Sequence, residues 1–454
     1  MRIRLTWIAA VLTLVAMGFL VACSTKYTKS SNGLVVVATE ASPVMQTFSL
    51  NLGNGQLSQI NNANGPPIPG IPGPVVIDPA GAFAYVASTI NCVPQNLPAN
   101  TSLTAVQGAI VSYKISSDGK LSAGTVQYLK GNAAYPAGFP ACGLDDSGNP
   151  NAGNPVVALT IDSTGKYLFV ATAPATATYT INLNTTPVAT LATLNSTGVA
   201  VFAIGANASL TEVPGSPFAL PPQDGQTPAP SALAVTPTVY PAQFAFCSGH
   251  AAPTTENLYV TDSVNYLLLN YSVNMSTGVL SLTAFSNAAP GISTGTIPSG
   301  VAVDPCNRFV YVSNERDKSV SAYNICSAIT PSCQRADFSL QPVTGSPFPI
   351  SPGDSPGPLA VDPFGNFLYV VDGGSSQLSA FRIGSGNGGL TSIGTYATGT
   401  GANSIAIRGD DTWIFVANLT SSTLSEYAIV PASGTLAPQA PVTTLNTPTG
   451  VAVK

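Results

Sequence analysis

The sequence predicts an all-β protein that folds as a single seven-bladed β-propeller. Two observations predict this fold: a set of short strand-like segments recurs seven times along residues 33–454, and the repeat is out of step with the chain termini. Apolar residues make up 45% of the 454 residues and charged residues only 8%, so core material is plentiful and global disorder is excluded.

The first two elements of the repeat are short aliphatic or aromatic segments bounded by turn residues, which is typical of strands. The first element occurs at 75–78, 159–162, 233–236, 301–304, 359–362, 405–408 and 451–454. The second element ends in strings such as YVSN and occurs at 36–39, 85–88, 169–172, 259–262, 311–314, 369–372 and 415–418. Tight-turn sequences such as Asp362-Pro363-Phe364-Gly365 join the two, so we expect antiparallel neighbours.

The third element carries an aromatic residue two places before an aliphatic one. Its copies lie at 47–50, 112–115, 201–204, 270–273, 322–325, 380–383 and 426–429. Residues two apart in a strand share a face, so this face should pack on a neighbouring sheet. A shorter fourth element begins near a Gly-x-Leu, as in Gly434-Thr435-Leu436, and no segment shows a sustained helical period.

The phase of the repeat indicates a closed ring. The chain begins with a second-type strand, Leu34–Thr39, and ends with a first-type strand, Val451–Lys454. We therefore expect the C-terminal strand to pair with the N-terminal blade and supply its missing inner strand, which leaves no exposed sheet edge inside the ring.

The N-terminus reads as an export signal. Arg2 and Arg4 precede an apolar run, Leu5–Phe19, and the Leu-Val-Ala-Cys sequence that ends at Cys23 resembles the bacterial lipoprotein box. We therefore expect a lipoprotein signal peptide at 1–22, a lipidated tether at 23–32 and the propeller at 33–454. This places the protein in the bacterial cell envelope, in the periplasm or at the cell surface, held to the membrane by lipid on Cys23. An uncleaved membrane anchor is the alternative.

Charge and composition exclude several classes of function. The net charge is −5 and no Lys/Arg cluster exists, so nucleic acid is not an expected partner. His250 is the single histidine and falls in a long connection between strands, so a serine triad is not expected. No spacing motif demands a metal or another cofactor, and we expect none. A monomer is expected.

The Tyr-Val-Thr-Asn-like strings, with the Asp-Pro turns before them, resemble the lactonase-type seven-bladed propeller family, which includes bacterial 6-phosphogluconolactonases. The resemblance covers roughly residues 33–454. It implies a lactonase, which is a carboxylic ester hydrolase that opens a sugar lactone or another lactone. Because a fold does not determine a function, a non-catalytic surface propeller that binds a carbohydrate or a protein is the alternative.

One charged turn is the candidate catalytic site. Within Glu315-Arg316-Asp317-Lys318, Glu315 could act as a general base and Arg316 could stabilise an oxyanion. In the resembled family an arginine often follows the asparagine of this turn; here Glu315 stands there and Arg316 is displaced by one. The alternative is a solvated loop. Polar residues expected at equivalent mouth positions, as ligand-binding candidates, are Glu40, Asp262, Asn314, Asp372 and Asn418.

Long insertions enlarge several blades. Residues 89–108 and 173–197 separate second and third strands, and 129–155 connect two blades on the same face. They could form a lid or side wall that recognises uncharged polar ligands, or they could be decoration. The insertion at 237–256 is expected on the opposite face.

Six cysteines besides Cys23 suggest disulfides in an exported protein. Assignment of the cysteines to faces of the ring favours three pairs, Cys92–Cys142, Cys247–Cys306 and Cys326–Cys333. Six free thiols are the alternative.

Overall fold

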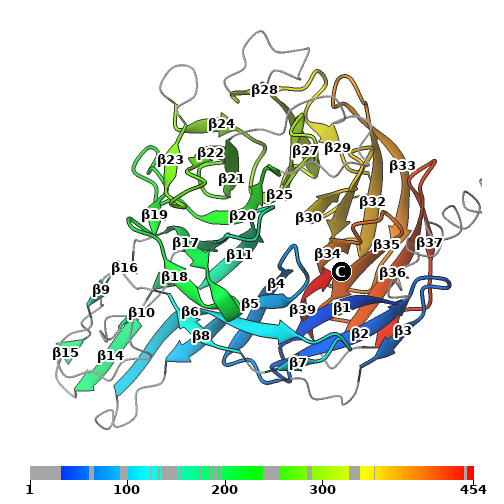
Figure 1. The fold of residues 1–454 in the computed structure, drawn as a ribbon. Coiled ribbons are helices and arrows are strands. Elements are labelled where there is room, and N and C mark those ends of the chain that lie inside the picture. The colour runs from blue at the N-terminus through cyan, green and yellow to red at the C-terminus, as the bar shows by residue number, and fades with distance from the viewer. Residues whose placement is uncertain are drawn as a thin grey trace, which may run out of the picture.

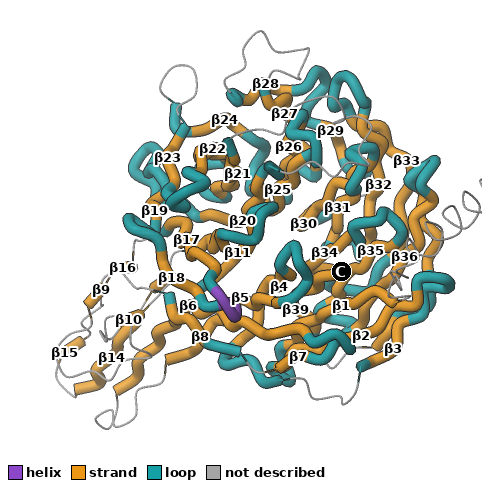
Figure 2. Tube along the Cα trace, viewed as in Figure 1, coloured by secondary structure: helices purple, strands orange, loops and turns teal. Residues whose placement is uncertain are grey.

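The computed structural model describes residues 32–60, 66–92, 101–122, 124–129, 133–134, 151–152, 155–173, 175–176, 178–183, 186–187, 193–194, 197–238, 255–283, 289–326, 338–351, 353–443 and 447–454. Seven antiparallel sheets of four or more strands are arranged in a ring (Figure 1), which confirms the predicted seven-bladed β-propeller. The described residues contain one helical segment, the 3-10 helix η1 (Ala206–Ala208), which Figure 2 shows in purple among the strands. No helix among these residues is long and apolar enough to cross a membrane.

Each blade has an inner strand at the centre of the ring. These strands are β4 (Ile71–Ile77), β11 (Val156–Ile161), β20 (Pro230–Val235), β25 (Pro298–Val303), β30 (Pro356–Val361), β34 (Ala402–Ile407) and β39 (Pro448–Val453). None carries a charged side chain, and small or aliphatic residues dominate them. The wall of the central channel is therefore built from uncharged residues.

The second and third strands pair outward from the inner ones. The second strands are β1 (Asn32–Thr39), β5 (Phe83–Cys92), β12 (Tyr167–Thr172), β21 (Glu256–Asp262), β26 (Phe309–Asn314), β31 (Phe367–Asp372) and β35 (Trp413–Asn418). The third strands are β2 (Val44–Asn51), β6 (Thr101–Ile115), β17 (Gly198–Ile204), β22 (Leu267–Val273), β27 (Ser319–Ile325), β32 (Gln377–Ile383) and β36 (Thr423–Val430).

The remaining strands of the ring form the outer edges of the blades, and most of them are short. They are β3 (Leu57–Gln59), β7 (Leu121–Ser122), β8 (Val126–Tyr128), β18 (Leu210–Glu212), β19 (Phe218–Ala219), β23 (Leu280–Leu282), β24 (Gly291–Ser293), β28 (Leu340–Pro342), β29 (Phe348–Pro349), β33 (Leu390–Ala397), β37 (Thr435–Pro438) and β38 (Val442–Thr443). We number the blades in chain order, so that blade 1 contains β1 and blade 7 contains β36.

The ring closes as predicted. β39 pairs with β1 in register Val451↔Val37, which gives the sheet order β3-β2-β1-β39. Two backbone hydrogen bonds extend the ladder: Leu34 N donates to Lys454 O at 3.2 Å, and Lys454 N donates to Leu34 O at 2.8 Å. The last strand of the chain is thus the inner strand of the first blade.

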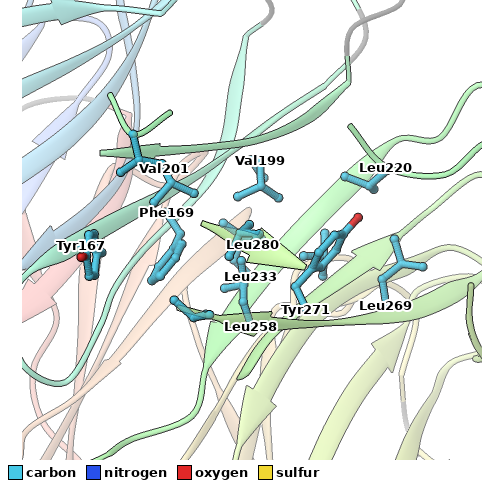
Figure 3. Close-up of a cluster of buried hydrophobic side chains, with 14 residues drawn as sticks. Tyr167, Phe169, Val199, Val201, Leu220, Leu233, Leu258, Leu269, Tyr271 and Leu280 are labelled. Carbon is cyan, nitrogen blue, oxygen red and sulfur yellow. The ribbon is translucent and has the colours of Figure 1, made fainter. Parts of the chain in front are cut away.

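The apolar face of each third strand packs on the preceding blade. Seven buried clusters result, one between each pair of neighbouring blades. Figure 3 shows the cluster between blades 3 and 4, where Tyr271 and Leu269 of β22 lie among Phe169, Val199 and their neighbours. The core is therefore divided among the interfaces between blades, and each blade depends on both of its neighbours.

A glycine in the turn before an outer strand completes several of these contacts. Gly434 has φ +72°, and a Cβ there would overlap the ring of Phe367 in blade 6. Gly388 has φ +68° and lies on Phe309 of blade 5 in the same way. Only glycine combines this left-handed conformation with so close an approach, which explains the Gly-x-Leu element.

Candidate ligand-binding mouth

The turns from second to third strands lie on one face of the ring, which we call the mouth. The described turns of this type include Glu40–Pro43, Ser263–Tyr266, Glu315–Lys318, Gly373–Ser376 and Leu419–Ser422. The links between successive blades run on the same face. Function therefore depends on which side chains these turns and links expose.

The two predicted aspartates are fully buried anchors of their turns. Asp262 Oδ1 accepts hydrogen bonds from the backbone N–H groups of Ala229 at 3.0 Å and Val264 at 3.1 Å. Asp372 binds the link between blades 5 and 6, and its Oδ1 accepts from Ser355 N at 3.0 Å. Neither aspartate is exposed. Each joins its own turn to the preceding link, and neither could reach a ligand in this conformation.

The two predicted asparagines are likewise buried, and each forms the same pattern of hydrogen bonds in its own blade. Asn314 Nδ2 donates to the hydroxyls of Ser319 at 3.0 Å and Ser321 at 2.9 Å. Asn418 makes the equivalent bonds to two hydroxyls in blade 7. The structure therefore gives these residues a different role from ligand contact: they position the hydroxyl groups that begin the next strand.

Glu40 lies apart from these residues, in the turn of blade 1. Its side chain is half-buried, and its backbone N–H donates to Thr447 O at 2.9 Å. This bond joins the first turn of the chain to the last link. No contact brings the Glu40 side chain to the other predicted residues within the described part of the mouth.

Glu315 is held across the interface between blades 5 and 6. Its Oε1 accepts a hydrogen bond from Ser355 Oγ at 2.8 Å. Asp372 fixes the backbone of that link, and Lys318 forms an ion pair with Asp354 at 2.9 Å. Glu315 is half-buried, whereas Lys318 is exposed. The carboxylate that the sequence predicts as a base is thus oriented by the neighbouring blade.

Arg316 is exposed beside Glu315. Its backbone N–H donates to Thr296 O at 3.3 Å, and Thr294 N donates to Tyr266 O at 2.9 Å. The Tyr266 side chain is 39% exposed. The two turns that carry this exposed tyrosine and this exposed arginine therefore both bond, through their backbones, to the same link between blades 4 and 5.

The other acid of this turn is already engaged. Asp317 accepts two hydrogen bonds from Thr296, from its N–H and its Oγ1, both at 2.7 Å. These bonds hold the pKa of the Asp317 carboxyl below its usual range. Asp317 therefore stays charged and closes the turn. The Glu315 carboxylate instead accepts from Ser355, in the link between blades 5 and 6.

The long insertions of blades 2 and 3 contain strands within the described residues. β5 and β6 stay paired out to Cys92↔Ala105, and β14 (Thr178–Leu183) pairs with β6 from Thr178↔Thr104 to Ile181↔Thr101. Small pairs accompany them: β9 (Ala133–Ala134) with β10 (Asn151–Ala152), β13 (Ala175–Thr176) with β16 (Thr193–Leu194), and β15 (Thr186–Pro187) with β14. In Figure 1 this lobe extends from one side of the ring, as a side wall would. That it recognises a ligand stays a prediction.

Several predicted residues lie outside the described residues. These are the signal peptide and tether up to residue 31, with Cys23, together with Cys142, Cys247, His250 and Cys333. Cys92 ends β5. Cys306 and Cys326 are buried and disulfide-bonded. Which cysteine pairs with which stays a prediction.

Sequence reasoning missed two residues of the mouth. Tyr266 and Ser355 flank the charged turn on its two sides, from blade 4 and from the link before blade 6. Tyr266 occupies the turn position that is Lys318 in blade 5, and alignment of the turns by their last residue could have found it. Ser355 lies in a link that does not repeat, so the sequence holds no comparable signal for it.

Comparison with known proteins confirms the resemblance to lactonase-type propellers. Residues 339–454 match the family model described as a lactonase with a seven-bladed β-propeller. A 6-phosphogluconolactonase from Pectobacterium atrosepticum is 30% identical over 160 residues, which are 35% of this chain and 47% of that protein. The matched segment thus spans about half the length of that relative.

Solved structures share the fold along nearly the whole chain. A periplasmic gluconolactonase from Pseudomonas aeruginosa superposes with a TM-score of 0.62 at 18% identity, covering 93% of this chain and 99% of the other. A protein from Lactobacillus plantarum gives a TM-score of 0.61 at 14% identity, with 93% and 99% coverage. At such identities the likeness concerns the fold alone.

Proposed function

We propose that this lactonase-like propeller is an exported, lipid-anchored enzyme that hydrolyses an uncharged sugar lactone or a similar lactone at its mouth. The observation that carries the proposal is the arrangement of Glu315, which the neighbouring blade orients through Ser355, next to the exposed Arg316. A general base beside a cation can catalyse ester hydrolysis, since one activates water and the other stabilises the oxyanion.

The reaction balances with these two side chains and water. Glu315 takes a proton from a water molecule whose oxygen bonds to the lactone carbonyl carbon. Arg316 stabilises the negative charge that develops on the carbonyl oxygen. The acyl carbon–ring oxygen bond then breaks, and the ring oxygen receives the proton from Glu315 and leaves as a hydroxyl. The product is the open hydroxy acid.

The charges at the mouth favour a substrate without a phosphate group. Lys318 is already paired with Asp354 at 2.9 Å, and the inner strands carry no charge. Among the described residues of this region, Arg316 is the cation that no ion pair occupies. A phosphate is usually held by several donors, arginine above all. The exposed ring of Tyr266 offers instead an apolar face for a sugar ring.

Lactone hydrolysis by purified variants tests the proposal. Acid release from glucono-1,5-lactone, corrected for spontaneous opening, should exceed that from the 6-phosphorylated lactone. Glu315→Gln keeps size and removes basicity, and should lower kcat by about 10²–10⁴ with the fold intact. Asp317→Asn in the same turn is the matched control and should keep most activity. Activity that survives both Glu315→Gln and Arg316→Ala would contradict this site.

Export and anchoring rest on the N-terminal sequence. The basic start, the short apolar run and Cys23 support a lipoprotein signal, and the Pseudomonas aeruginosa protein of the same fold is a periplasmic enzyme. Replacing Cys23 by alanine should release the protein from the membrane fraction. If the Cys23→Ala protein sediments with membranes as the parent does, the anchor is not lipid on this cysteine.

A non-catalytic surface propeller is the second candidate. The observation that favours it is that four of the predicted polar residues at the mouth are buried in turn networks, which leaves few groups for chemistry. It predicts binding of a carbohydrate or a protein without turnover of any lactone.

A further inference from the structure

Blade 7 contains a pocket of about 280 Å³ that lies apart from the charged turn of blade 5. It lies between the third strand β36, the link from blade 6 and the segment that follows β37. Its polar lining comprises Thr398, Ser421, Thr423, Ser425, Glu426 and Gln439. We call it the rim pocket.

The pocket lies beside a short link between the two outer strands of blade 7. Blades 3 and 5 cross the equivalent gap with longer segments, 213–217 and 343–347, which join β18 to β19 and β28 to β29. In blade 7 the segment 439–441 joins β37 to β38. This link, Gln439-Ala440-Pro441, carries no hydroxyl group.

The longer links supply a hydroxyl group that blade 7 lacks. In blade 3, Val201 N donates to Ser216 Oγ at 3.0 Å, and in blade 5, Ala322 N donates to Ser346 Oγ at 2.9 Å. Glu426 occupies the same position of β36, and its carbonyl accepts from Gln439 N at 2.9 Å. Its own N–H has no acceptor among the described residues. This donor points to the side of the strand on which the pocket lies.

The other side of the pocket offers hydroxyls whose hydrogen bonds are partly set. Asn418 Nδ2 donates to Thr423 Oγ1 at 3.0 Å and to Ser425 Oγ at 2.9 Å. Both hydroxyls thus already accept a hydrogen bond, and Ser425 Oγ accepts a second one from Gly399 N at 3.3 Å. Ser421 Oγ lies 3.0 Å from Thr423 Oγ1. The buried Asn418 therefore positions hydroxyl groups of the pocket without lining the pocket itself.

The remaining lining sets the chemistry of the occupant. Tyr427, Pro438 and Pro441 contribute apolar surfaces, and no cationic side chain lines the pocket. Donors and acceptors beside apolar faces suit a molecule that is neutral and bears hydroxyls on a carbon ring. An anion such as a phosphate ester finds no positive charge here.

We propose that the rim pocket binds one neutral pyranose or polyol unit, with a ligand hydroxyl accepting from Glu426 N–H in the place that Ser346 Oγ takes in blade 5. The site is separate from the charged turn of blade 5, so the proposal does not depend on lactone hydrolysis. The unit can be a free monosaccharide or the end of a longer glycan, which share the same recognition.

Saturation-transfer NMR with the full-length protein tests the proposal. The probes are glucose, galactose, mannose, N-acetylglucosamine, myo-inositol and maltotriose, with glucose 6-phosphate as the charged control. At least one neutral probe should bind, and glucose 6-phosphate should not. Binding of maltotriose alone identifies the end of a glycan. If no neutral probe binds, or if only the phosphate ester does, the proposal is wrong.

A graft gives the decisive variant. Replacing Gln439-Ala440-Pro441 by the sequence of 343–347, Val-Thr-Gly-Ser-Pro, supplies the missing serine and fills the pocket. The grafted protein should lose sugar binding. Should the graft misfold, Thr423→Val removes one hydroxyl at constant size and should weaken binding about tenfold. Thr443→Val, exposed on β38, is the matched control and should not change affinity. Unchanged binding in the graft or in Thr423→Val would place the sugar elsewhere.

Discussion

Replacing Arg308 by methionine should remove a buried clamp between blades 5 and 6. Arg308 is 7% exposed and grips the carboxylate of Asp304 with two hydrogen bonds, from Nε at 2.9 Å and from Nη2 at 2.7 Å. The same guanidinium donates to two carbonyls of blade 6, those of Gly365 and Ser385, both at 3.1 Å. Methionine keeps the stem and loses all four bonds.

The expected cost follows from what remains buried. Asp304 is fully buried, and breaking a buried ion pair by removing one partner costs about 3–5 kcal/mol. Backbone N–H groups still donate to Asp304, from Cys306 and from residue 308, which places the cost near the lower end of that range. We expect the free energy of unfolding to fall by about 3 kcal/mol, with an unchanged denaturant slope.

Equilibrium unfolding in urea, followed by tryptophan fluorescence and circular dichroism, measures this change. Arg382→Met is the control, because Arg382 is exposed and stacks on Phe367 at 5.0 Å. An exposed contact of this kind contributes about 0.5–1 kcal/mol. If Arg308→Met costs less than about 1 kcal/mol, or no more than Arg382→Met, the clamp does not act as described.

Three further predictions concern the packing of the blades. Gly434→Ala forces a Cβ into the ring of Phe367 at φ +72° and should cost about 2 kcal/mol or more in thermal unfolding, whereas Gly386→Ala, with nothing within 4 Å, should cost little. Burial raises the pKa of Glu426 to about 7, whereas in the unfolded chain it lies at about 4.5. Between these pH values the unfolded state releases the proton and the folded state keeps it, so the free energy of unfolding falls as pH rises from about 4.5 to about 7. Glu426→Gln should therefore raise the urea midpoint at pH 8 and hardly change it at pH 4.5; an equal shift at both would refute the assignment. Deleting 448–454 removes the ladder of β39 with β1 and should lower the melting temperature sharply, while an unchanged value would contradict closure of the ring.

The fold was predictable because its signals are local and repeated. An aromatic two places before an aliphatic residue marks the face of a third strand, and the buried pairs Tyr323–Ile325 and Tyr427–Ile429 confirm it. The offset between the two chain ends predicted the pairing of β39 with β1. Seven copies of each pattern remove the ambiguity that one short strand carries.

The position of the mouth residues was predictable from the sequence, but their burial and their contacts were not. Asp262 and Asn314 end second strands as expected, yet each is fully buried because the link before its own blade folds onto it. Links differ in length and sequence from blade to blade, so no periodic pattern predicts their packing. The rim pocket has the same kind of origin, since the segment 439–441 beside it differs in length and sequence from the segments 213–217 and 343–347.

A crystal structure of the protein soaked with gluconate, the product of glucono-1,5-lactone hydrolysis, tests the proposed function most directly. The account predicts gluconate at the mouth, with its carboxylate on Arg316, near Glu315, and its carbon chain against the exposed ring of Tyr266. Gluconate bound away from this turn at full occupancy, or a mouth left empty at saturating gluconate, would contradict it.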